Sequence, residues 1–187
     1  MSEIMNFNPK HKAISKRLIL LSLAVVLLFG IPPRKAAAQA NVSAHATAEV
    51  IEALTATETA ELNFGRFSPE TAGGVVKLTP LGVRSSAGTV ALSGGTHNAA
   101  SFHITGQYGA TVTITLPSTP AVLINSASSK TMEVSNFESF PSAGLGVGVL
   151  TDGELEVKVG ATLTVGDMND NPVGIYEGTY SITFSYN

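Results

Sequence analysis

The last stretch of the chain shows the clearest alternation of apolar and polar positions. From Tyr176 onward the even-numbered residues are Tyr, Gly, Tyr, Ile, Phe and Tyr, and the odd-numbered ones are Glu, Thr, Ser, Thr, Ser and Asn. Side chains of a β-strand point alternately to its two faces, so this pattern predicts a strand with one apolar face and one polar face. Because a strand this apolar aggregates if left exposed, we expect its own fold or a partner to cover it. The residues assigned to this structural or assembly role are Gly174, Tyr176, Tyr180, Ile182, Phe184 and Tyr186.

The outward and inward positions of this strand can be predicted individually. We expect Tyr180, Ile182 and Phe184 to lie in the core, with the intervening Thr and Ser residues on the outer face. Tyr186 shares the inward parity but lies at the chain end, so its hydroxyl should find a hydrogen-bond partner or water.

Two segments in the middle of the chain predict β-hairpins. Alternating residues 100–106 and 111–116 flank a turn at 107–110, and residues 147–150 and 155–159 flank Thr151-Asp152-Gly153. Asp-Gly favours the positive φ angles that tight turns require. In the arm that follows, Leu155, Val157 and Val159 should face inward.

Residues 42–64 also alternate, with small apolar residues at most even positions and Thr, Ser, His or Glu at many odd ones. The alternative is an Ala/Glu-rich helix over 44–61, but the density of Thr favours a strand. Across the chain, about nine or ten short strands separated by turn residues predict an all-β antiparallel sandwich that forms one domain over 41–187.

The N-terminal region reads as a signal peptide over residues 1–40. Lys10, Lys12, Lys16 and Arg17 precede a mostly apolar run from Leu18 to Ile31, and Ala38-Gln39-Ala40 is a small-x-small cleavage site. The rival interpretation is an uncleaved membrane anchor, but this run is shorter than the roughly 20 residues that span a bilayer. We expect cleavage before Asn41, export, and no membrane span in the mature chain.

Removing residues 1–40 makes the chain strongly acidic. Six of the 11 basic residues and one of the 14 acidic ones lie in this region, which leaves 5 basic and 13 acidic residues, a net charge of −8. No basic patch remains for phosphate contacts, so nucleic-acid binding is not expected. The chain contains no Cys, which excludes disulfides, thiolate zinc sites and a Cys nucleophile.

The sequence offers little candidate chemistry, and we predict that the protein is not an enzyme and needs no cofactor. His45, His97 and His103 lack metal-ligand spacing, and no nucleophile elbow or phosphate-binding loop is present. The one cluster of hard oxygen ligands is Asp167-Met168-Asn169-Asp170-Asn171. It resembles the start of a calcium loop but has Pro172 where that loop needs glycine, and an acidic turn between strands is the simpler interpretation.

Five segments of the chain, in this order, resemble a secreted bacterial family known only as domain of unknown function 4402. The family name carries no activity, so the resemblance implies fold and export alone. The matching segments are Leu62-Asn63-Phe64-Gly65, Ala99-Ala100-Ser101-Phe102 with Thr105-Gly106, Thr113-Ile114-Thr115-Leu116-Pro117, Val159-Gly160-Ala161-Thr162-Leu163, and Gly174 through Tyr186.

A second resemblance concerns the C-terminal strand. Gly174 is fourteenth from the end and Tyr186 is penultimate, which is similar to subunits of chaperone–usher fimbriae. That resemblance implies an incomplete immunoglobulin-like sandwich, held first by a periplasmic chaperone and then completed by the N-terminal extension of another subunit. The chain departs from these subunits in lacking a disulfide and in offering mainly alanines in the candidate extension, Asn41 to Val50.

Two hypotheses therefore remain open. The first is a non-enzymatic structural or adhesive surface protein that assembles by β-strand addition. The second is a self-complete secreted β-sandwich that binds carbohydrate or an ion, in which Asn41 to Val50 form the first strand of their own sheet. They differ in whether those ten residues pair within their own domain.

Overall fold

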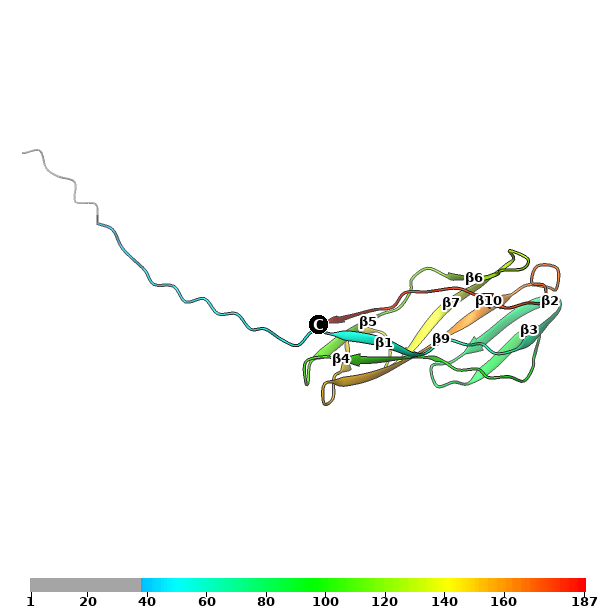
Figure 1. The fold of residues 1–187 in the computed structure, drawn as a ribbon, viewed down its shortest axis with the longest axis horizontal. Helices are drawn as coiled ribbons and strands as arrows, with labels where there is room; N and C mark the ends of the chain where they lie inside the picture. Colours follow the sequence, from blue (N-terminus) through cyan, green and yellow to red (C-terminus); the bar gives the residue numbers. More distant parts are fainter. Residues whose placement is uncertain (1–37) are drawn as a thin grey trace, which may run out of the picture. The chain divides into compact units, whose positions relative to one another are not determined.

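The computed structural model describes residues 38–187, so the predicted signal peptide falls almost wholly outside the described residues. Glu49–Asn187 form one compact unit, drawn in Figure 1. The described residues contain no helix. The eleven strands are β1 (Thr55–Ala60), β2 (Phe67–Leu78), β3 (Arg84–Leu92), β4 (Ala100–Thr105), β5 (Thr111–Thr115), β6 (Ala121–Asn125), β7 (Thr131–Phe140), β8 (Gly144–Val149), β9 (Glu154–Val165), β10 (Tyr176–Glu177) and β11 (Thr183–Tyr186).

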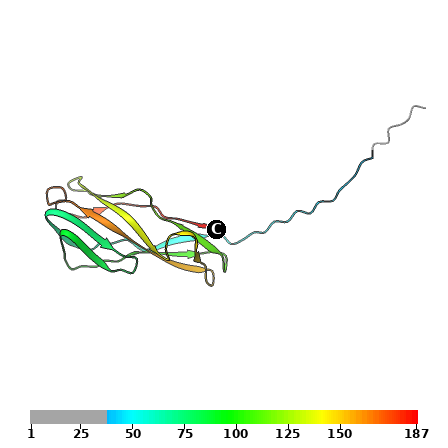
Figure 2. The ribbon, with the colours of Figure 1, turned by 180° about the vertical axis from the view of Figure 1, so that it is seen from behind.

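The strands form two antiparallel sheets, which confirms the predicted all-β sandwich. The larger sheet has eight strands in the order β1-β4-β9-β7-β6-β10, with β2 also paired to β9 and β3 paired to β2. The smaller sheet has the order β11-β5-β8. The long strand β9 organises the larger sheet: β4 and then β2 pair along one of its edges, and β7 pairs along the other. Figure 2 shows β7 and β9 side by side.

The core consists of two clusters of buried side chains. One cluster contains residues from β2, β3, β7 and β9 together with Phe64, and the other contains residues from β4, β5 and β9 together with Leu150. The predicted alternation along β9 is confirmed, because Val157 and Val159 are buried while Glu154 and Glu156 are exposed. The aliphatic side chains of this one strand therefore contribute to both clusters.

Both predicted hairpins are wrong in their pairing. The turn at Asp152 and Gly153 does form, with positive φ at both residues. However, β8 pairs with β5 in the smaller sheet, whereas β9 pairs with β4, β7 and β2 in the larger one. Likewise, β4 and β5 flank the turn at 107–110 but lie in different sheets. Local turn chemistry sets the direction of the chain, whereas each strand pairs where its apolar face is buried.

The prediction of a strand over 42–64 holds only for β1. Residues 38–54 belong to no strand, and all of them are exposed except the half-buried Leu54. Even the two valines of this region, Val42 and Val50, are 86% and 97% exposed. Alanine buries little apolar surface, so this row of small residues gains little from packing on its own.

Candidate functional site

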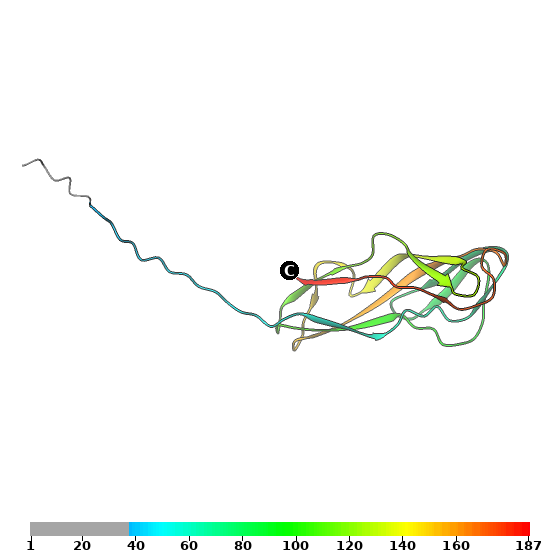
Figure 3. The ribbon, with the colours of Figure 1, turned by 45° about the horizontal axis from the view of Figure 1, so that its top comes forward.

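A groove of about 950 Å³ lies between two segments that are far apart in the sequence. One border is the end of β1 and the chain after it, residues 58–69. The other is the C-terminal segment from Met168 to Ile182, which runs lengthwise along the domain in Figure 3. The floor is apolar and comes from four strands of the larger sheet: Phe102 of β4, Leu123 of β6, Met132 of β7 and Leu163 of β9.

Each border of the groove includes a strand that is paired along one edge only. Within residues 38–187, β1 pairs with β4 alone, and β10 pairs with β6 alone. Between β10 and β11, Thr179, Tyr180 and Ser181 belong to no strand and make no backbone–backbone hydrogen bond with other residues of 38–187. Unpaired amide and carbonyl groups along a strand edge are a template for pairing with another strand.

The predicted single C-terminal strand is interrupted because its two ends join different sheets. Tyr176 and Glu177 pair with β6 of the larger sheet, and Thr183–Tyr186 pair with β5 of the smaller one. The predicted alternation is present: Tyr180, Ile182 and Phe184 are half-buried and pack against the second core cluster, whereas Thr179, Ser181 and Thr183 are exposed. These side chains are half-buried rather than fully buried. Tyr180 and Ile182 line the open groove.

Gly174 and Tyr176 fix the start of this segment. A β-carbon at Gly174 would collide with the side chain of Asn125, so the segment passes β6 at a distance that only glycine allows. Tyr176 packs against the first core cluster, and its hydroxyl donates to the Pro172 carbonyl at 2.9 Å. Both residues thereby hold the segment against the larger sheet where the groove begins.

Tyr180 is the most unusual side chain of the groove. Its ring lies 5.1 Å from that of Phe137, centroid to centroid. Its hydroxyl is buried and has no hydrogen-bond partner among the described residues. Burial raises the pKa of Tyr180 well above its ordinary value, and the nearby Glu58 carboxylate raises it further. The hydroxyl therefore stays protonated at neutral pH, which excludes a phenolate nucleophile or base.

Tyr186 has the hydrogen-bond partners that its position predicted. Its hydroxyl accepts the backbone N–H of Gln107 at 2.7 Å and donates to the carbonyl of Glu52 at 2.8 Å. A β-carbon at Gly106 would collide with this hydroxyl, so the close approach requires glycine there. Tyr186 thus links the C-terminal strand to the residues just before β1.

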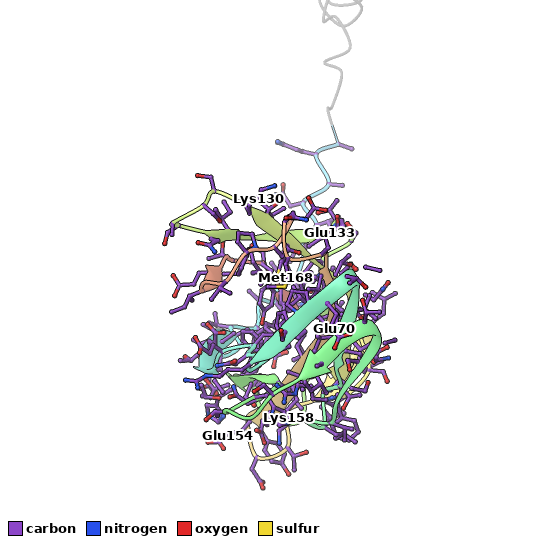
Figure 4. All side chains as sticks on the ribbon, turned by 90° about the vertical axis from the view of Figure 1, so that its right-hand side faces the viewer. Glu70, Lys130, Glu133, Glu154, Lys158 and Met168 are labelled. Carbon is purple, nitrogen blue, oxygen red and sulfur yellow. The ribbon has the colours of Figure 1, made fainter. Side chains whose placement is uncertain are left out.

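The predicted acidic turn lies at one end of the groove. The Asp167 carboxylate accepts the backbone N–H groups of Asn169 and Asp170 at 2.8 and 2.9 Å, and these hydrogen bonds lower the pKa of Asp167. The Asn171 side chain donates to the Thr131 carbonyl at 2.8 Å. Met168, from this turn, lines the groove, and Figure 4 labels it in the view onto this end of the domain. Backbone hydrogen bonds therefore already engage one oxygen of the Asp167 carboxylate.

We expect calcium to leave the melting temperature of the protein unchanged, because the Asp167 carboxylate is engaged by its own turn and Pro172 replaces the loop glycine. Thermal unfolding with and without millimolar calcium measures this. A rise of more than a few degrees that is lost in Asp167→Ala would show instead that this turn binds the ion.

The sequence did not reveal the border formed by residues 58–69. Leu62 and Phe64 contact the core and line the groove, yet they lie outside regular strands. Arg84 fixes this irregular segment, because its guanidinium donates to the carbonyls of Phe64 at 2.9 Å and Ser93 at 2.7 Å. The Phe-Gly pair at 64–65 was the only available signal, and it carried no information about a groove.

The comparison with known families identifies the chain. The model of the family described as Domain of unknown function (DUF4402) matches residues 54–186, so the chain belongs to this family. No curated protein and no solved structure matches it. Within residues 38–187, the fold contains no helix that could cross a membrane.

Proposed function

We propose that this family member is a non-enzymatic, exported structural or adhesive protein that assembles by β-strand addition. The observation that carries the proposal is the groove itself, which has an apolar floor and whose borders include β1 and β10, the two edge strands of the larger sheet's strand order. An added strand would hydrogen-bond to the free backbone of Thr179–Ser181 and cover Tyr180 and Ile182. Before assembly, a periplasmic chaperone would shield the same surface.

The segment Asn41–Val50 has the properties of the added strand. It belongs to no strand, its residues are exposed, and its even positions carry only Val and Ala. Ten extended residues span about 33 Å. The floor already contains large side chains such as Phe102, Leu123 and Met132, so small residues on the incoming strand fit over them without overpacking.

The alternative function, a self-complete module that binds carbohydrate or an ion, required Asn41–Val50 to be the first strand of their own sheet. These residues belong to no strand in the described part of the chain, which favours assembly over the solitary module.

The proposal is tested on the exported protein by light scattering after size exclusion, combined with amide hydrogen exchange. We expect multimers that persist on dilution, and slow exchange at Thr179, Tyr180 and Ser181 in the multimer. A protein that stays monomeric at every concentration, with fast exchange at these three amides, would refute assembly. Binding of an oligosaccharide to that monomer would support the alternative function.

A further inference from the structure

Three backbone and side-chain hydrogen bonds join the C-terminal strand, the turn after β4 and the residues before β1. Tyr186 Oη bonds to Gln107 N–H and to the Glu52 carbonyl, and Glu52 N–H donates to Gln107 Oε1 at 3.3 Å. Two residues further on, Leu54 packs against the second core cluster. We call the three residues Glu52, Gln107 and Tyr186 the tyrosine latch.

The tyrosine latch marks the point at which the N-terminal segment becomes fixed to the folded unit. From Glu52 onward the chain is held by hydrogen bonds, by core packing and then by β1, whereas Asn41–Val50 belong to no strand. Because Tyr186 ends β11 and Glu52 precedes β1, the latch also ties β11 to the residues that lead into β1.

The segment cannot easily return to the groove of its own domain. A strand that folded back beside β1 would need a tight turn near the latch, and tight turns favour Gly, Pro, Asn, Asp or Ser. Residues 49–54 are Glu, Val, Ile, Glu, Ala and Leu, none of which belongs to that set. The β-branched pair Val50-Ile51 favours extended chain instead. Under the proposed function, the segment that enters each groove therefore comes from a second copy.

We propose that the tyrosine latch makes the joint between successive copies short and stiff. This inference rests on the proposed function. If Asn41–Val50 fill the groove of a second copy, only Ile51 separates that inserted strand from Glu52, which the latch holds on its own domain. Two residue steps span at most about 7 Å, so the two domains must touch. The assembly is a rigid rod rather than a string of freely hinged domains.

Tyr186→Phe tests the latch because it removes the hydroxyl and keeps the ring. Tyr108→Phe is the matched control, since Tyr108 follows Gln107 in the same turn, is 72% exposed, and its hydroxyl makes no hydrogen bond within residues 38–187. In Tyr186→Phe we expect amide exchange at Gln107 to accelerate about tenfold, because the Gln107 N–H loses its hydrogen-bond acceptor. Exchange in Tyr108→Phe should match the parent. Unchanged amide exchange at Gln107 in Tyr186→Phe would show that the Tyr186 hydroxyl does not protect this amide, which would refute the tyrosine latch.

The stiffness of the joint is measured by electron microscopy of assembled protein. We expect straight rods from the parent and from Tyr108→Phe, and bent ones from Tyr186→Phe. An insertion of Gly-Ser-Gly-Ser between Ile51 and Glu52 should bend them as well, while preserving assembly. If the parent forms no multimers, the proposed function fails. The exchange experiment still shows whether the Tyr186 hydroxyl holds the turn at Gln107. If multimers form and both variants stay as straight as the parent, the stiff joint alone is refuted.

Discussion

Ala46→Arg is expected to abolish assembly while leaving the β-sandwich folded. Ala46 is exposed and belongs to no strand, so the free energy of unfolding should change by no more than about 0.5 kcal/mol. In an inserted strand, however, Ala46 is the central residue of the row that faces the groove. Burying an unpaired guanidinium there costs several kcal/mol, which lowers the affinity by about 1,000-fold or more. Light scattering should detect only monomer.

Thr47→Arg is the control for this variant, because residue 47 has the opposite parity and would face solvent in the inserted strand. It adds the same charge one position along and should assemble like the parent. Assembly that is abolished by Thr47→Arg but tolerated in Ala46→Arg would mean that the odd-numbered residues enter the groove. Assembly that survives in both would show that residues 41–50 are not the added strand.

The sequence predicted the faces of strands more reliably than it predicted their partners. Along β9 and in the C-terminal segment, the alternation of single residues correctly separated Val157 and Phe184 from exposed neighbours, because side-chain direction follows from local backbone geometry. Pairing depends on the whole fold. Asp152 and Gly153 form their turn, yet the strands on either side of it join different sheets. No local signal distinguishes a hairpin from such a crossing.

The groove was harder to predict than the fold because its borders contain backbone segments that pair with no neighbouring strand. Residues 42–54 alternate like a strand but form none, and Thr179–Ser181 lie in a predicted strand yet have no backbone partner within residues 38–187. The opposite border includes an irregular segment that Arg84 holds through the carbonyl groups of Phe64 and Arg66. Only the spatial arrangement shows that these borders face each other over the apolar side chains of the larger sheet.

Phe184→Ala is expected to lower the free energy of unfolding by about 3 kcal/mol, through lost apolar burial and the cavity that remains. Phe184 stands opposite Ile114 in the smaller sheet, and its ring centroid lies 5.8 Å from that of Phe102 in the larger one. It therefore contributes directly to the packing of one sheet on the other. We place the effect at the low end for Phe→Ala because the side chain is half-buried. Denaturant midpoints measure the loss.

Thr183→Ala provides the comparison, because Thr183 precedes Phe184 in the same strand and is exposed. It should change the free energy of unfolding by no more than about 0.5 kcal/mol. A larger loss from Thr183→Ala than from Phe184→Ala would place β11 one residue out of register and reverse the face that packs on β4. The two variants also separate folding from assembly. If both unfold like the parent as monomers yet neither forms multimers, the apolar face of β11 acts between copies of the chain rather than within one.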